Sequence, residues 1–161
     1  MKGTPYLVRY QLDLERMTVH QRQIISSHKP ASKMAAANHF DFPQINERFR
    51  FHRYCYVYGV AMRSDGKHLG HMSLVKKDLC GGKKDKVVQG RGLYFQEPQF
   101  VARPNAVAED DGALIVFITD GVKKRSYVAI YDALTMELDN KAILPTILPF
   151  SLHGSYFPGQ L

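Results

Sequence analysis

Apolar and polar residues alternate in short runs along most of the chain, and Gly, Pro, Asn and Asp separate the runs. Alternation with a period of two is typical of β-strands, whereas an amphipathic helix repeats every 3.6 residues. The helical period is almost absent, so the pattern predicts an all-β chain. The predicted strands are 7–14, 17–25, 71–77, 86–89, 113–119, 126–131 and 136–143.

Three of the predicted turns contain an aspartate between an outgoing and a returning strand. These residues are Asp13, Asp78 and Asp132, which are 65 and 54 positions apart. Such a spacing exceeds a hairpin and suits a repeated four-stranded unit, the blade of a β-propeller, which usually spans about 40 to 50 residues. The chain has 161 residues. A closed seven-bladed propeller needs roughly 350, so this length supplies about three blades. A complete β-sandwich fits the strand pattern equally well.

Composition favours a folded chain, since 45% of the residues are apolar and 23% are charged, close to the averages for globular domains. The longest apolar run, 113–119, is far shorter than the roughly 20 residues that cross a bilayer. Met1 is not followed by an apolar signal segment, so a cytoplasmic location is predicted. Cys55 and Cys80 are too few for a disulfide framework and lack C-x-x-C spacing. We therefore predict that both are structural thiols in a reducing compartment.

The formal net charge is +7, which suits an acidic partner such as nucleic acid or an anionic membrane. Much of this charge falls on predicted turns, which favours solvated loops over a phosphate-binding surface. The residues concerned are Lys76, Lys77, Lys83, Lys84, Lys86, Lys123, Lys124 and Arg125. A nucleic-acid-binding β-domain would instead require Tyr54, Tyr56 and Tyr58 to share an exposed face. Burial of that face against a neighbouring blade explains the same spacing.

Consecutive acidic residues at Glu109, Asp110 and Asp111 precede Gly112. They lack the alternating oxygen ligands and distant glutamate of an EF-hand, so we predict a tight turn before the strand at 113–119. The chain has no phosphate-binding glycine loop, G-x-S-x-G elbow or H-E-x-x-H helix, which leaves those enzyme classes without a motif. A histidine near the end, His153, lies among apolar residues and before Gly154. Taken alone, such a histidine is more typical of a core residue than of a metal ligand.

Six segments occur in an order and spacing typical of one family. They are FDFPQIN at 40–46, YVYG at 56–59, EPQFVARP at 97–104, EDDG at 109–112, YDA at 131–133 and LPFSLHG at 148–154. Together they resemble the carotenoid oxygenases, and the first two resemble the animal branch. The resemblance extends from about Tyr6 to Phe157. It implies that residues 1–161 are the C-terminal fragment of a carotenoid oxygenase domain, with about three blades of a seven-bladed β-propeller.

Members of this family hold Fe(2+) through four histidines, and the resemblance implies that His153 is the ligand that this chain supplies. Such a site needs open coordination positions for dioxygen or substrate. A carboxylate that accepts the other ring N–H fixes each imidazole, and Glu97 and Asp41 match the family's acidic positions. Asp41 is shorter than the glutamate usual there. Gly154 is expected to allow close packing or a strained dihedral. The other histidines, His20, His28, His39, His52, His68 and His71, match no ligand motif.

The resemblance also implies an apolar polyene substrate, either a carotenoid, an apocarotenoid or a retinoid, together with dioxygen. Phe150 and Leu152 flank His153 and are candidates for the wall of the substrate tunnel, although strand alternation would equally place them in blade packing. Peripheral membrane contact is implied for the parent enzyme, and no nucleic-acid partner is expected. Because one imidazole cannot hold iron, we expect the isolated chain to be inactive. A non-catalytic β-propeller-like interaction module remains the alternative.

Overall fold

The computed structural model describes residues 8–23, 40–64, 69–81, 85–157 and 159. Strands dominate these residues, with one short 3-10 helix, η1, at Glu47–Phe49. The strands are β1 (Val8–Asp13), β2 (Thr18–Gln23), β3 (Phe40–Gln44), β4 (Tyr56–Ser64), β5 (Leu69–Asp78), β6 (Lys86–Gln89), β7 (Leu93–Phe95), β8 (Gln99–Ala102), β9 (Gly112–Asp120), β10 (Arg125–Asp132) and β11 (Leu138–Ile143). The predicted all-β class is therefore confirmed.

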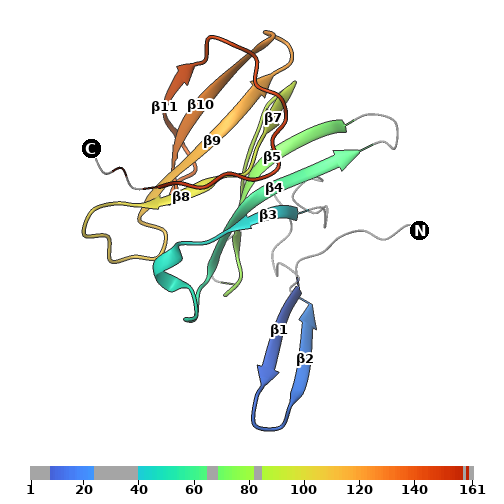
Figure 1. The fold of residues 1–161 in the computed structure, drawn as a ribbon, viewed down its shortest axis with the longest axis vertical. Helices are drawn as coiled ribbons and strands as arrows, with labels where there is room; N and C mark the ends of the chain where they lie inside the picture. The colour runs from blue at the N-terminus through green and yellow to red at the C-terminus, as the bar shows by residue number, and fades with distance from the viewer. Residues whose placement is uncertain (1–7, 24–39, 65–68, 82–84, 158, 160–161) are drawn as a thin grey trace.

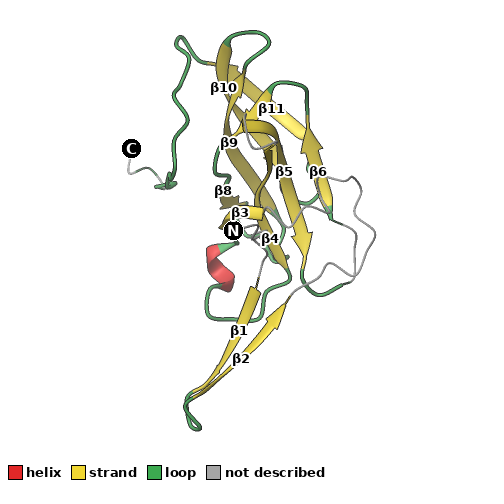
Figure 2. Cartoon of the chain, turned by 90° about the vertical axis from the view of Figure 1, so that its right-hand side faces the viewer, coloured by secondary structure: helices red, strands yellow, loops and turns green. Residues whose placement is uncertain are grey.

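The strands form two antiparallel sheets and one separate hairpin (Figure 1). The first sheet has the order β3-β4-β5-β6. The second has the order β11-β10-β9, and both β7 and β8 pair with β9 along its other side. The β1–β2 hairpin extends away from both sheets (Figure 2). The described residues thus contain two blade-like sheets, while the third blade stays a prediction.

Alternation along β9 explains how the two sheets pack. Leu114, Val116 and Ile118 are fully buried, whereas Phe117 on the opposite face is 41% exposed. The buried side chains form one core with residues of the first sheet, including Val60 and Leu74. Each fully buried aliphatic side chain contributes about 1.5 to 3 kcal/mol through loss of apolar surface. The main core therefore lies between the two sheets.

Two glycines let β3 lie close to β4 and β8 lie close to β9. A Cβ at Gly59 of β4 would lie 2.5 Å from the Phe40 ring and 2.7 Å from the Asp41 carbonyl. A Cβ at Gly112 of β9 would meet the Phe100 ring in the same way. Substitution at either position would displace an aromatic ring and the strand that carries it. Gly59 and Gly112 therefore have equivalent packing roles in the two sheets.

The predicted turn aspartates do close turns through their side chains. Asp13 Oδ1 accepts the backbone N–H groups of Glu15 and Arg16, and Asp78 Oδ1 accepts those of Cys80 and Gly81. Asp132 Oδ1 accepts the Thr135 N–H at 2.6 Å. These are Asx turns, in which a short acidic side chain replaces a backbone acceptor. The sequence prediction is confirmed at all three positions.

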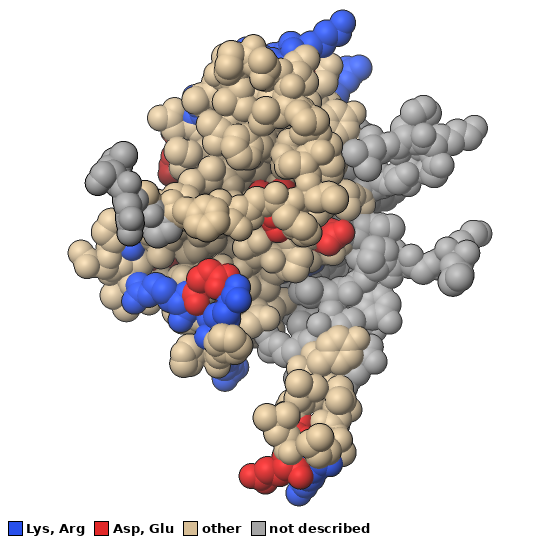
Figure 3. Space-filling model, viewed as in Figure 1, with Lys and Arg blue, Asp and Glu red and all other residues tan. Residues whose placement is uncertain are grey.

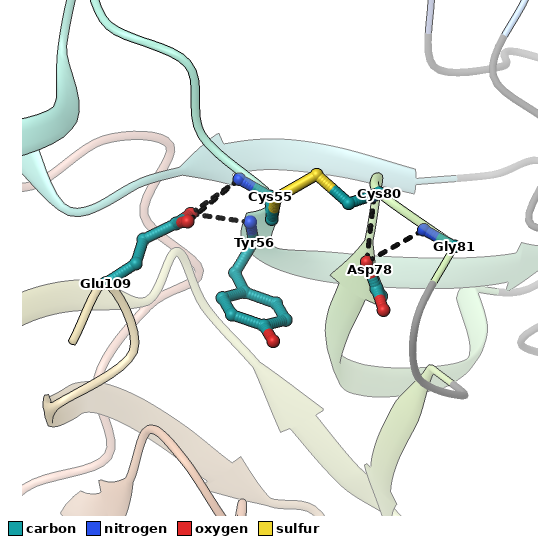
Figure 4. Close-up of a disulfide and its surroundings, with 6 residues drawn as sticks. All are labelled: Cys55, Tyr56, Asp78, Cys80, Gly81 and Glu109. Atoms are coloured by element: carbon teal, nitrogen blue, oxygen red, sulfur yellow. Dashed lines mark hydrogen bonds between the residues drawn. A yellow bond between two sulfur atoms is a disulfide. The ribbon is translucent and has the colours of Figure 1, made fainter.

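The cysteine prediction is wrong, because Cys55 and Cys80 form a disulfide (Figure 4). Cys55 directly precedes β4 and Cys80 follows β5, and β4 pairs with β5 so that Tyr56 lies opposite Asp78. The two cysteines therefore extend the end of a strand pair, where neighbouring Cα atoms are close enough for a disulfide. Their separation of 25 residues concealed this proximity in the sequence.

The prediction of solvated lysines holds for Lys86, Lys123 and Lys124 and fails for Lys76 and Lys77, while Lys83 and Lys84 lie outside the described residues. Lys123 and Lys124 are exposed in the turn after β9, as expected. Lys76, by contrast, lies on β5 with its side chain only 6% exposed, and its Nζ is 2.7 Å from Asp110 Oδ2. Lys77 Nζ pairs with Asp85 Oδ2 at 3.1 Å. These charges therefore neutralise acidic side chains instead of entering solvent.

The tyrosines of β4 do not form an exposed stacking surface. Tyr58 is 1% exposed, stacks on Phe100 and donates its hydroxyl to the Ala133 carbonyl at 3.2 Å. Burial raises the pKa of this hydroxyl far above its ordinary value. On the face shown in Figure 3, the coloured basic side chains lie in separate groups, some intermixed with acidic ones. No helix among the described residues is long and apolar enough to cross a membrane.

Candidate functional site

Glu97 lies in the gap between β7 and β8, which both pair with β9. β7 pairs with β9 as far as Phe95, and pairing resumes at Gln99 of β8. Pro98 is fully buried within the gap, and a proline has no N–H to donate to the sheet. The interruption releases the Glu97 side chain from the ordinary alternation of the strand.

β3, at the edge of the first sheet, has a matching irregularity. The register of β3 against β4 shifts between Asp41 and Gln44, with Phe42 at a φ of 53° and Pro43 beside it. A positive φ at a phenylalanine is a strained conformation that surrounding packing must hold. The two irregular strands meet, because Gln44 Nε2 donates to Glu97 Oε1 at 2.9 Å.

The segment after β11 returns across both sheets without entering either (Figure 1). Buried Ser126 accepts the Leu148 N–H through its hydroxyl at 2.9 Å. Gln96, which is 2% exposed, donates to the Pro149 carbonyl and accepts the Ser151 hydroxyl. The polar side chains of the second sheet thus hold the segment that carries His153.

His153 is brought to Glu97 by this segment. His153 Nδ1 is 3.4 Å from Glu97 Oε1, and the Gly154 N–H donates to Glu97 Oε2 at 2.9 Å. Glu97 is 9% exposed while His153 is 77% exposed. The Phe42 ring and the imidazole form a T-shaped pair, with ring centroids 5.8 Å apart and an interplanar angle of 76°. Contact at Nδ1 leaves Nε2 as the nitrogen available to a metal, which is the usual arrangement of a carboxylate–histidine pair.

Asp41 is not part of this group. Its exposed side chain accepts the Phe42 N–H through Oδ1 at 2.8 Å, on the strand at the edge of the first sheet. Gln44, from the same segment, is the residue that reaches Glu97. The sequence motif at 40–46 contains both Asp41 and Gln44. It does not predict the register shift that places Gln44, and not Asp41, against Glu97. The predicted role of Asp41 toward an imidazole therefore stays a prediction.

Phe150 and Leu152 are 44% and 68% exposed on either side of the anchored Ser151. A depression of about 560 Å³ opens beside the site, and its lining includes Gln44, Phe100 and Tyr156. Neither Phe150 nor Leu152 belongs to its lining. Their assignment to a tunnel wall therefore stays a prediction. Close packing at Gly154 is not observed, since a Cβ there would have nothing within 4 Å.

None of the other described histidines forms a metal-binding group with His153. His20 and His52 are exposed, and His71 lies on β5, while His28, His39 and His68 fall outside the described residues. Within the described part of the chain, no group of three or more His, Cys, Asp or Glu side chains is placed to hold a metal. His153 offers one nitrogen donor, so a metal bound there would need further ligands from outside the described residues.

The acidic run at 109–111 forms the predicted turn, with the Asp111 N–H donating to the Ala108 carbonyl. Its carboxylates have further roles that the sequence did not reveal. Glu109 accepts the N–H groups of Cys55 and Tyr56 at the start of β4 (Figure 4), and Asp110 pairs with Lys76. The run therefore joins the second sheet to β4 and β5 of the first.

Comparison with known proteins identifies the fold. The family model described as retinal pigment epithelial membrane protein matches residues 2–158. The mitochondrial carotenoid-cleaving dioxygenase of Homo sapiens is 34% identical over 73% of this chain and 20% of that protein. The carotenoid 9,10(9',10')-cleavage dioxygenase of Crocus sativus is 32% identical over 93% of this chain and 29% of that protein.

Solved structures agree with these sequence relatives. The cobalt-substituted Synechocystis ACO has a TM-score of 0.79 and 27% identity, over 96% of this chain and 31% of that one. A chimera of ACO and RPE65 has a TM-score of 0.76 and 25% identity, over 96% of this chain and 31% of that one. This similarity supports the β-propeller architecture over a complete sandwich. The chain spans less than a third of the length of these relatives, and it belongs to the family of carotenoid oxygenases and the retinal pigment epithelial membrane protein.

Proposed function

We propose that the chain is the C-terminal part of a non-haem iron(II) carotenoid oxygenase and supplies His153 as one of four histidine ligands. The observation that carries this proposal is the position of Glu97, whose carboxylate contacts both His153 Nδ1 and the Gly154 N–H. A nearly buried carboxylate beside an exposed imidazole can fix the direction of that imidazole as a metal ligand. Asp41 is proposed to serve an imidazole that lies outside this chain.

The proposed reaction is oxidative cleavage of a carbon–carbon double bond in a carotenoid or apocarotenoid. Both atoms of dioxygen enter the two carbonyl products, so no external reductant is required. Iron(II) with open coordination positions would supply dioxygen binding and activation. The residues of this chain hold and orient one nitrogen donor, and the anchoring of Pro149 and Ser151 by Gln96 limits its movement. Isomerisation of retinoids by the same kind of centre is the alternative within the family.

Phe150 and Leu152 are proposed to face the substrate, because both are apolar, exposed and adjacent to the ligand position. Peripheral contact with a membrane is proposed for the whole enzyme, since its substrate is an apolar polyene. The predicted cytoplasmic location belongs to the same proposal, and the disulfide between Cys55 and Cys80 is at odds with its reducing environment. As an isolated chain, residues 1–161 are expected to show little or no turnover.

The test begins with the complete transcript, which should continue upstream of Met1 and encode further blades with three more histidines. The protein from that reading frame should convert a carotenoid into two carbonyl products in air and should be inactive without dioxygen. His153→Ala should abolish turnover, whereas His52→Ala, which alters an exposed histidine away from Glu97, should not. A complete frame of 161 residues that binds a protein partner would instead favour the interaction module.

A further inference from the structure

The Glu97 carboxylate has three partners, and one of them comes from the other sheet. Oε1 accepts Gln44 Nε2 at 2.9 Å and lies 3.4 Å from His153 Nδ1, while Oε2 accepts the Gly154 N–H at 2.9 Å. The shortest contact between a side chain and this carboxylate is therefore made by Gln44. A hydrogen bond to an ionised acceptor is roughly twice as strong as one between neutral groups.

This bond controls the orientation of the carboxylate. The terminal torsion of a glutamate is broad and has no sharp preference, so the plane of its oxygens is fixed by its partners. Gly154 N–H restrains Oε2, but it belongs to the same exposed segment as His153. Gln44 belongs to β3, which is paired with β4. It is therefore the partner that ties Oε1 to the scaffold independently of the segment being oriented.

Two residues at the register shift in β3 support His153, one directly and one through Glu97. The Phe42 ring makes a T-shaped contact with the imidazole, and Gln44 holds the carboxylate that lies against Nδ1. The two residues are separated by Pro43, at the irregularity where Phe42 has a positive φ. This strained backbone places one side chain against the imidazole and the other against the carboxylate beside it, which ordinary strand pairing does not require.

We propose that Gln44 is a positioning residue for His153, which acts through Glu97 to keep the proton on Nδ1 and the Nε2 lone pair free. This inference rests on the proposed ligand role of His153 and adds a contribution from the neighbouring sheet. Loss of the Gln44 amide would let the carboxylate rotate and weaken its hold on Nδ1. The imidazole would then redistribute between its two neutral tautomers.

The chain contains a matched control at Gln99. Gln99 follows Pro98 as Gln44 follows Pro43, and it lines the same depression. Within the described residues its Nε2 is buried without a hydrogen-bond partner. Gln44→Met and Gln99→Met therefore remove the same amide from equivalent positions with little change in size. Gln44→Glu is a second variant, which preserves shape and places a repelling carboxylate against Glu97.

The experiment measures the ¹⁵N shifts of the His153 ring in the 161-residue chain at an alkaline pH at which the spectra show no imidazolium form. The unmodified chain should populate mainly the Nδ1–H tautomer. Gln44→Met should lower the ratio of Nδ1–H to Nε2–H by about threefold or more, since it removes a charge-assisted bond. Gln44→Glu should lower it further, and Gln99→Met should leave it unchanged.

Each result has a defined meaning, provided that backbone amide spectra show a folded chain. An unchanged ratio in both Gln44 variants, with a lower ratio in Glu97→Gln, overturns the role of Gln44 while the Glu97–His153 pair stands. An unchanged ratio in Glu97→Gln as well contradicts the orientation on which the proposed function depends. If one Gln44 variant does not fold, the other gives the same comparison with Gln99→Met.

Discussion

Lys76 is a buried cation whose partners are distant from it in the sequence. Its ammonium lies 2.7 Å from Asp110 and also donates to the Ala133 carbonyl at 2.9 Å, and it is 4.4 Å from the centre of the Tyr56 ring. Asp110 and Ala133 belong to the segments that flank β9 and β10, so the pair joins the two sheets. Both side chains are less than a tenth exposed, where neither charge is screened by solvent.

Lys76→Met is expected to lower the free energy of unfolding by about 3 kcal/mol or more, because it leaves the buried Asp110 charge unpaired. Lys123→Met, in an exposed turn, should change it by less than about 0.5 kcal/mol. Urea unfolding of both variants measures the difference. The double variant Lys76→Met with Asp110→Asn should recover part of the loss. Equal stability of Lys76→Met and Lys123→Met would contradict this account.

Asp132 makes the free energy of unfolding depend on pH. Partial burial raises the pKa of its carboxyl, but hydrogen bonds from Arg103 and Thr135 outweigh burial and lower the pKa to about 2. The folded state therefore favours the charged form, and this stabilisation is complete above the ordinary carboxyl pKa of about 4. It is lost as pH falls from about 4 toward about 2.

The stability difference between the unmodified chain and Asp132→Asn should shrink over that interval. Denaturant unfolding at a series of pH values measures it, with Asn retaining an oxygen for the Thr135 N–H. A difference that stayed constant from about pH 5 down to about pH 2 would show that the carboxylate charge contributes nothing.

At the scale of elements, local patterns were predictable and distant pairings were not. Alternation identified β9, and the three turn aspartates identified turns, because these features depend on neighbouring residues. The site depends on contacts across longer separations: Gln44 and Glu97 are 53 positions apart, and Glu97 and His153 are 56 apart. Motif order indicated Glu97 and His153. The register shift that brings in Gln44 instead of Asp41 has no local signal.

The Cys55–Cys80 disulfide closes the β4–β5 strand pair at the end nearest Glu109 (Figure 4). Reduction by a dithiol should lower the free energy of unfolding by about 3 kcal/mol, the usual contribution of a disulfide closing a loop of this size. Guanidinium unfolding with and without reductant measures the change. The double variant Cys55→Ser with Cys80→Ser should be insensitive to reductant. Two free thiols in the untreated chain would contradict the disulfide.

Across the whole molecule, the second sheet has one buried and one uncovered face. Ile115 and Phe117 of β9 pair with Ile130 and Val128 of β10, and Phe117 and Ile130 are 41% and 37% exposed. An apolar face of this kind on a blade is suited to a further blade, because each blade of a propeller covers its neighbour. It also favours self-association when nothing covers it.

Phe117→Lys with Ile130→Lys should reduce self-association of the chain in sedimentation measurements while changing its stability by less than about 1 kcal/mol. Ile118→Ala, on the buried face, should cost about 3 kcal/mol without reducing association. A large stability loss in the double lysine variant would show that this face is already packed within the chain.

The most direct measurement is the iron bound per molecule of the longer protein proposed to contain this chain, compared among the unmodified form, His153→Ala and His52→Ala. The account predicts about one iron in the unmodified form and in His52→Ala, and at least about tenfold weaker retention in His153→Ala, since removal of a ligand costs more than removal of its supporting residues. Equal iron retention in His153→Ala and the unmodified protein would contradict the assignment of His153 as a ligand.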